Sequence, residues 1–206
     1  MVIAGTISGS STFELPVTMT AVGAPSNLEV DASIVKPYSS VTLKWAAGAN
    51  GVNNPVSSYT IWYSTNSGSS WTELDSNVKT TSCPFIVGDR GTVYSFRIMS
   101  FGSGGLNSGF TTSGNICTVN SLPNAPTLSA SASTFNGEPI IITLTAGNTN
   151  NSGQNAKLYY TTSNGGAKKP ASSTFTVPVS DFASATSVTY YFWTYDGLEY
   201  SSSYAS

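Results

Sequence analysis

The chain has 206 residues, enough for one large domain or two small ones, and it is unusually poor in charge. Only 9% of the residues are charged, and 8 Lys and Arg against 10 Asp and Glu give a net charge of −2. About 47% of the residues are Ser, Thr, Asn or Gly, so hydroxyl and amide groups supply most of the polarity. The aromatic content of 12% argues against a disordered chain.

The composition also excludes several functions. A net negative chain offers no basic surface that could displace phosphate counterions, so we expect no nucleic-acid partner. The sequence contains no histidine, which removes Ser-His-Asp and Cys-His nucleophile systems and the commonest metal ligand. No apolar run reaches the roughly 18 residues of a membrane helix. We therefore expect no membrane partner, cofactor or metal, and the N-terminus does not resemble a signal peptide because the first positive charge is Lys36.

Strand signals begin at the N-terminus and continue along the whole chain. Apolar or aromatic residues alternate with Ser and Thr, and Gly, Asn and Pro interrupt the runs, which is typical of an all-β protein. Residues 1–24 hold two extended runs, 2–7 and 12–20, and carry one charge, Glu14. We interpret them as a β arm, which either adds strands to a neighbouring subunit or packs as a hairpin on its own chain.

The rest of the chain reads as two copies of one unit, residues 25–120 and 121–206. Two pairs of segments match between the copies at offsets of 96–97 residues: 59–68 with 156–165, and 93–96 with 189–192. This offset is close to the roughly 100 residues of an immunoglobulin-like sandwich. The repeat therefore predicts tandem β-sandwiches.

The first copy contains the segment Val41-Thr42-Leu43-Lys44-Trp45. This segment resembles the second strand of a fibronectin type III domain, in which Trp45 is the core tryptophan. Gly91-Thr92-Val93-Tyr94-Ser95-Phe96 resembles the strand that carries the family's corner tyrosine, here Tyr94.

The second copy is a weaker match to the same family. It keeps Tyr190 at the corner position but has Leu144 where the tryptophan stands in the first copy. The resemblance implies an all-β chain of two tandem fibronectin-III/Ig-like β-sandwiches, preceded by the N-terminal β arm.

A second resemblance rests on residues 45–59 and on Arg97-Ile98-Met99-Ser100-Phe101-Gly102. Both are similar to fibronectin-type modules of bacteriophage virion proteins. This implies a non-enzymatic structural protein on the exposed virion surface, as capsid decoration or tail component, present in many copies per particle. Its expected partners are other virion proteins, the capsid or tail subunits, and, weakly, host-surface glycans. The alternative is an extracellular carbohydrate-binding or spacer module of a secreted bacterial enzyme or adhesin.

Strand alternation predicts one aromatic surface in the second copy. Leu158, Tyr160, Tyr190, Phe192 and Thr194 are expected to face the core. The residues expected to face outward are Lys157, Thr161 and four aromatic residues, Tyr159, Tyr191, Trp193 and Tyr195. Such a row suits a subunit interface or a glycan surface, or else cross-strand packing worth roughly 0.2–1 kcal/mol per pair.

In the first copy the matching outward residue is Trp62, flanked by Ser95 and Arg97, and we interpret it as packing. Cys83 and Cys117 are expected to be unpaired thiols rather than a disulfide.

The acidic residues predict no catalytic site. Glu73 and Asp75 lie two apart on a strand or hairpin, but a small sandwich offers no cleft for a glycosidase pair. The loop 88–91 supplies one carboxylate, which is too few for calcium.

Overall fold

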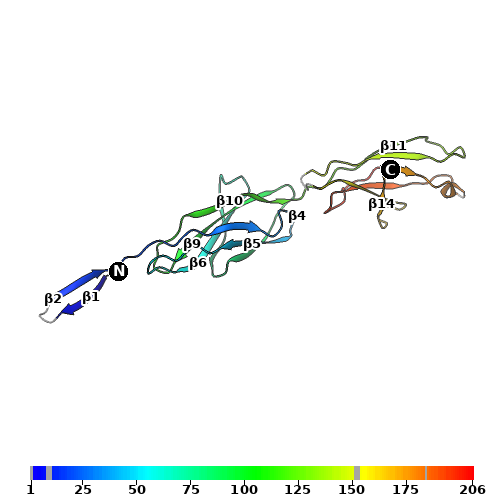
Figure 1. Ribbon diagram of the computed structural model, residues 1–206. Helices are drawn as coiled ribbons and strands as arrows, with labels where there is room; N and C mark the ends of the chain where they lie inside the picture. Colours follow the sequence, from blue (N-terminus) through cyan, green and yellow to red (C-terminus); the bar gives the residue numbers. More distant parts are fainter. Residues whose placement is uncertain (1, 8–10, 151–153, 184) are drawn as a thin grey trace. The chain divides into compact units, whose positions relative to one another are not determined.

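The computed structural model describes residues 17–150, 154–183 and 185–206, and the backbone of residues 2–7 and 11–16. The described part is all-β, with strands β1 to β16 and one short 3-10 turn, η1 (Val179–Phe182) (Figure 1). Nothing in this part of the chain is a helix long and apolar enough to cross a membrane.

The N-terminal section forms a hairpin with a sheet of its own. Strands β1 (Val2–Ile7) and β2 (Ser11–Pro16) pair antiparallel, from Val2 opposite Pro16 to Ile7 opposite Ser11. They form a two-stranded sheet that is not hydrogen-bonded to the other four sheets, which make up two sandwiches. The second run, predicted over 12–20, is shorter than expected because β2 ends at Pro16. Proline has no backbone N–H to continue a ladder.

The first sandwich consists of a five-stranded and a three-stranded sheet. The larger sheet has the order β4 (Ile34–Val35), β10 (Phe110–Val119), β9 (Val93–Gly102), β6 (Val56–Ser64), β7 (Thr72–Val78). The smaller sheet has the order β3 (Ser26–Val30), β5 (Ser40–Ala46), β8 (Ser82–Ile86).

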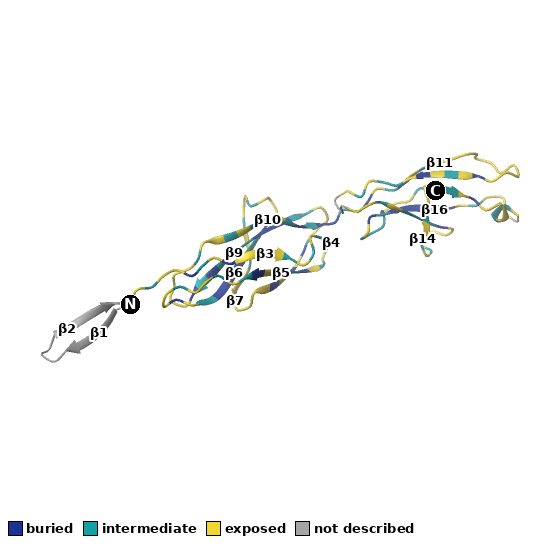
Figure 2. Cartoon of the chain, viewed as in Figure 1, coloured by how far each residue is buried: buried dark blue, intermediate teal, exposed yellow. Residues whose placement is uncertain are grey.

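The core of the first sandwich follows strand alternation. In β5, Val41, Leu43 and Trp45 are buried and alternate with more exposed residues. Trp45 packs edge-on against Tyr59 at 5.4 Å between ring centroids, and Tyr94 is buried against Phe85 at 5.0 Å. The predicted signature residues Trp45 and Tyr94 therefore lie in the core, while exposed residues gather on the connecting loops (Figure 2).

The second sandwich has two three-stranded sheets. One has the order β11 (Thr127–Ala130), β12 (Ile141–Thr145), β15 (Thr174–Thr176), and the other β14 (Lys169–Ala171), β13 (Lys157–Thr161), β16 (Tyr191–Tyr195). After β16 a closing segment returns along this strand and forms bridges between Tyr195 and Tyr200 and between Phe192 and Ala205.

Tyr190 and Phe192 are buried at the centre of the second core, as alternation predicted. Leu158 and Tyr160 pack against this core from β13, and Thr194 is also buried. The Tyr190 hydroxyl donates a hydrogen bond to the Asp181 carboxylate in η1. Burial and this bond raise the pKa of Tyr190 above its usual value.

Both sandwiches share one strand order. When β4 and β10, which among the described residues occur only in the first sandwich, are left out, each sandwich has six strands: the first, second and fifth form one sheet, and the third, fourth and sixth form the other. In each, the entering chain also lies against a glycine after the second strand: an added Cβ would lie 2.0 Å from the Gly23 oxygen at Gly48 and 2.1 Å from the Asn124 oxygen at Gly147. This shared detail supports the duplication predicted from the sequence.

The chain divides into two compact units. The first comprises Met1–Ser33, Tyr38–Val87 and Thr92–Thr118, and the second comprises Ile34–Pro37, Gly88–Gly91 and Val119–Ser206. The predicted limits of the arm and the two sandwiches, at residues 24 and 120, remain predictions.

Candidate functional site

The outer face of the β14-β13-β16 sheet carries the four aromatic residues predicted there. Tyr159 on β13 lies opposite Trp193 on β16. Tyr191 and Tyr195 lie two residues before and two residues after Trp193 on the same strand, so they project on the same side of the sheet as Trp193. The structure brings all four onto one face of the sheet.

Trp193 is not exposed on this face, contrary to the sequence prediction. Only 5% of the residue is accessible, because Tyr204 of the closing segment lies edge-on at 5.5 Å and Tyr191 at 6.2 Å. The Lys168 ammonium also lies 4.4 Å from the centre of the Trp193 ring. Thr161, likewise predicted to face outward, is buried at the end of β13.

Three half-buried tyrosines, Tyr159, Tyr195 and Tyr200, contact one another beside Trp193 on this face. Tyr159 stands edge-to-face with Tyr195 (5.6 Å, 74°) and with Tyr200 (5.2 Å, 89°). Burial among these rings raises the pKa of Tyr200, and the Tyr195 hydroxyl donates to the Gly197 carbonyl at 2.8 Å. The interlocked rings differ from the flat row that stacks best on a sugar and have the geometry of cross-strand packing. Their outer edges remain available to a partner.

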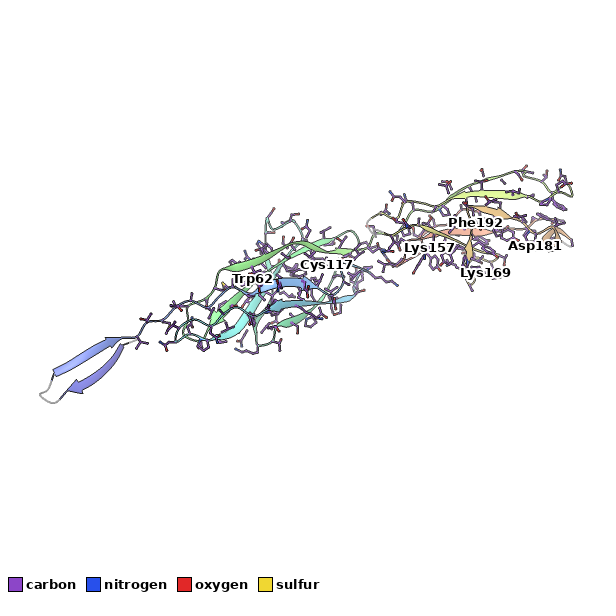
Figure 3. All side chains as sticks on the ribbon, viewed as in Figure 1. Trp62, Cys117, Lys157, Lys169, Asp181 and Phe192 are labelled. Atoms are coloured by element: carbon purple, nitrogen blue, oxygen red, sulfur yellow. The ribbon has the colours of Figure 1, made fainter. Side chains whose placement is uncertain are left out.

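The first sandwich has a corresponding cluster around Arg97. The guanidinium lies over three rings, at 5.2 Å from Trp62, 4.8 Å from Trp71 and 4.3 Å from Phe110. Figure 3 labels Trp62. Trp62 and Phe110 also meet edge-to-face at 5.3 Å. Trp62 therefore belongs to a cation–π group, whereas its predicted neighbour Ser95 is buried and bonded to Asn115 at 2.6 Å.

The two clusters use equivalent positions with exchanged residue types. Trp62 on β6 corresponds to Tyr159 on β13, and both pair with the matching residue of the sixth strand, Arg97 or Trp193. In the first sandwich that residue is the cation and Trp71 supplies a ring. In the second sandwich the sixth-strand residue, Trp193, is the ring, and Lys168 supplies the cation. Lys168 lies 97 positions after Trp71 in the sequence. The repeat offset is the signal that could have predicted the roles of Trp71 and Lys168.

A second feature that the sequence did not reveal is the anchor of the N-terminal section. The Asn54 side chain, which is fully buried, donates from Nδ2 to the carbonyls of Thr20 (2.9 Å) and Leu106 (2.6 Å). Its Oδ1 accepts from the backbone N–H of Gly104 (2.7 Å). The Val22 N–H also donates to Leu106. Residues 18–23 are thereby held against the loops of the first sandwich.

The two cysteines are buried, unpaired thiols, as the sequence favoured. Cys83 lies on β8 and Cys117 on β10, which belong to different sheets. Burial raises the pKa of Cys83, with a smaller contribution from Asp75, and burial raises the pKa of Cys117 to about 11. Both thiols are therefore protonated and unreactive at neutral pH.

The carboxylates of Asp196 and Glu199 are engaged in structural bonds. Asp196 is buried, and its Oδ1 accepts from the backbone N–H groups of Leu198 (2.9 Å) and Glu199 (2.6 Å). Its Oδ2 accepts from Asn120 (2.9 Å). Within the same unit Glu199 binds Arg90 at 2.6 Å and 3.0 Å, which lowers the pKa of Glu199 and raises that of Arg90.

The predicted acidic pair lies apart from these bonds. Glu73 and Asp75 are exposed on β7. The described residues contain no group of three or more His, Cys, Asp or Glu side chains that could hold a metal ion.

No family model and no curated protein sequence matches the chain. Among solved structures it is similar to a fourth FNIII domain from human, with a TM-score of 0.43 and 18% identity over 58% of this chain and 98% of that one. It is similar to the chicken CNTN1 FN1-FN3 domains (TM-score 0.40, 16% identity, 90% of this chain and 64% of that one). It is also similar to a beta-1,2-glucanase from Parabacteroides distasonis (TM-score 0.35, 14% identity, 52% and 15%).

Strand order and burial identify the fold. Both units have the strand order of one sandwich. Trp45 and Tyr94 in the first, and Tyr190 in the second, occupy the core. The chain thus consists of fibronectin type III- or immunoglobulin-like β-sandwiches preceded by a β hairpin.

Proposed function

We propose that the chain is a non-enzymatic structural protein of a phage virion, exposed on the capsid or tail in many copies and attached to other virion proteins. The observation that carries the proposal is the hairpin β1–β2, which forms a sheet separate from both sandwiches. An isolated two-stranded hairpin is marginally stable in water, and its free edges are ready to pair. Pairing with a strand of a partner subunit would satisfy these edges and stabilise the hairpin.

The state of the polar groups supports a role without catalysis. The carboxylates of Asp196 and Glu199 are occupied by backbone N–H groups, Asn120 and Arg90. The raised pKa of Cys83 and of Cys117 makes the thiols poor nucleophiles. The sequence offers no histidine as a general base. The chemistry that remains at the surface is recognition by hydroxyls, amides and aromatic rings.

The virion setting rests on the resemblance of residues 45–59 and 97–102 to phage modules. The low charge suits it, because a surface built from many identical copies would otherwise accumulate repulsion between like charges. Many weak contacts to host glycans would then add up through avidity.

A second candidate is an extracellular carbohydrate-binding or spacer module of a secreted bacterial enzyme or adhesin. The partly exposed rings of Tyr159, Tyr195 and Tyr200, with Lys168 at 4.8 Å from Tyr200, favour it because aromatic rings and a nearby cation are common in sugar recognition. Replacing Tyr200 by alanine should abolish glycan retention if this candidate is correct.

The test of the proposal is quantitative mass spectrometry on density-gradient fractions of the source culture. We expect peptides of this chain to migrate with DNA-containing particles, in a fixed ratio to the major capsid protein. Peptides found only in soluble medium or cell-wall fractions would refute the virion role and leave the secreted module.

A further inference from the structure

The outer face of the larger sheet in the first sandwich holds an arginine without an acidic or carbonyl partner. Arg97 lies on β9 between the buried core residues Phe96 and Ile98 and therefore projects away from the core. Within the described part of the chain its guanidinium forms no hydrogen bond and no ion pair, and its Nε is buried. A buried polar group without a partner is rare in a native protein and calls for an explanation.

Three aromatic rings hold this guanidinium but leave the end of its fork open. The rings of Trp62, Trp71 and Phe110 lie between 4.3 Å and 5.2 Å from its central carbon. Ring faces attract the charge but do not satisfy the N–H groups that lie in the guanidinium plane. Nε is the buried nitrogen of this side chain, whereas Nη1 and Nη2 remain accessible. Arg97 thus presents two parallel N–H donors to the solvent.

An acidic residue lies on the same face but does not pair with the fork. Glu73 on β7 is exposed and stands opposite Trp62, which in turn stands opposite Arg97. Glu73 forms no ion pair within the described residues. The fork of Arg97 is therefore available to an external anion.

A hydroxyl and an exposed ring lie next to the fork. Thr112 on β10 stands opposite Arg97 and is exposed, and its hydroxyl has no partner in the part of the chain that the structure describes. Phe110, two residues earlier on β10, is 49% exposed. Charge, hydroxyl and ring thus meet on the neighbouring strands β6, β9 and β10 (Figure 1).

We propose that this face binds a carboxylated pyranose, a sugar acid of the uronic or sialic type, with its carboxylate on Nη1 and Nη2 of Arg97. The guanidinium fork matches a carboxylate in a bidentate arrangement. The apolar C–H face of the sugar would pack on Phe110, and a sugar hydroxyl would bond to Thr112. This inference rests on the proposed contact with host-surface glycans and gives that contact a site and a ligand class.

A sugar acid fits this face better than an acidic peptide does. Strand β9 is paired with β6 on one side and with β10 on the other, so the backbone beneath Arg97 offers no free edge to an extended peptide. Recognition must therefore come from side chains alone.

The equivalent face of the second sandwich offers no such fork. Its cation, Lys168, lies over the rings of Trp193 and Tyr200, and Tyr204 covers Trp193. An ammonium group is a point charge and does not match a carboxylate in two places. The sugar acid is therefore expected on the first sandwich.

The test is an NMR titration of the isotopically labelled full chain, followed through the indole N–H signals of Trp62 and Trp71. The probes are the methyl glycosides of glucuronic acid and of N-acetylneuraminic acid; methyl glucoside, sodium acetate and a hexaglutamate peptide are the comparison ligands. We expect saturable shifts of both signals with at least one of the sugar acids. Because a charge-assisted hydrogen bond is lost with methyl glucoside, this neutral sugar should bind at least about tenfold more weakly.

Two pairs of variants locate the contact. Arg97→Lys keeps a charge beneath the rings but removes the fork, so it should weaken binding about tenfold, whereas Lys168→Gln should leave binding unchanged. Glu73→Gln removes the neighbouring carboxylate and should tighten binding about two- to fourfold at low salt. Glu29→Gln makes the same change at an exposed position of β3, in the other sheet, and should have no effect. Circular dichroism checks that each variant is folded.

Three results would overturn the inference. The first is that neither sugar acid shifts the Trp62 and Trp71 signals. The second is that methyl glucoside, acetate or the peptide binds as tightly as the sugar acids, which would make the face a general sugar, anion or peptide site. The third is that a folded Arg97→Lys variant binds like the unmodified chain or, if this variant unfolds, that Glu73→Gln does not tighten binding.

The outcomes for this site and for the virion role can be told apart. A chain that binds sugar acids but is missing from particle fractions would refute the virion role alone. A chain that is present in particles but binds neither sugar acid would refute this inference alone.

Discussion

Replacing Trp193 by alanine tests whether the outer aromatic cluster holds the second sandwich together. Since Trp193 is only 5% exposed, the substitution removes a tryptophan side chain that is almost completely buried. A buried aromatic side chain covers about 150–250 Å², and at about 25 cal/mol per Å² this corresponds to about 4–6 kcal/mol. Because neighbouring side chains relax into part of the space, we expect a loss of about 3–5 kcal/mol in the free energy of unfolding.

The assay is thermal and urea unfolding of the full chain, with hydrogen exchange on β13 and β16 to report on the second sandwich. For a unit of this size each kcal/mol shifts the melting temperature by about 4–8 °C, so the expected shift is on the order of 20 °C. Trp193→Phe keeps a ring under Tyr204 and should lose much less. Phe110→Ala, in the first sandwich, should leave exchange in β13 and β16 unchanged.

A loss below about 1 kcal/mol for Trp193→Ala would refute the reasoning, because a residue that supports the sheet through packing cannot be removed at so small a cost. The aromatic cluster would then contribute little to the stability of the second sandwich. The result would favour an exposed Trp193, as the sequence predicted, that is available to a glycan or to a partner subunit.

Three further predictions concern charge and thiol chemistry. Since the arginine partner lowers the pKa of Glu199, its contribution to stability is complete above the ordinary glutamate range and is lost as pH falls through the lowered value. Glu199→Gln should therefore flatten the loss of stability between about pH 5 and 3; parallel urea-midpoint curves for the two proteins would contradict this. Cys83 and Cys117 should react slowly with a thiol reagent at pH 8 in the native chain and rapidly in denaturant, whereas equally fast native labelling would rule out the buried, protonated state. Combining Arg97→Trp with Trp71→Lys should restore stability relative to the sum of the single substitutions by about 0.5–2 kcal/mol, because it recreates the exchanged contact of the second sandwich; purely additive losses in a double-mutant cycle would refute the equivalence.

Local patterns predicted the all-β class, several of the strands and the core residues that lie on them. Alternation in β5 and around Tyr190 fixes which side chains are apolar on one face, and burial of that face follows directly. The repeat offset likewise predicts two units of one topology. These features depend on residues that are close in the sequence or related by the repeat offset of 96–97 residues.

The cover over Trp193 could not be predicted in this way. Its exposure depends on Tyr204 and Lys168, which lie in segments without regular alternation, and their contact with the ring is a tertiary event. The same holds for Asn54, which sits in a loop of common turn residues, where nothing in the local sequence indicates that its amide joins two other segments.

The Asn54 anchor has a mechanical consequence. If the hairpin is gripped by a neighbouring subunit, a pull on it travels along residues 17–23 and meets the first sandwich where Asn54 binds the Thr20 and Leu106 carbonyls. A tensile force would then be spread over two loops before it reached the strand β3, so the sheets would be shielded from peeling at their N-terminal edge. Asn54→Ala should accordingly lower the rupture force of the first sandwich in single-molecule pulling, although it removes only one small side chain.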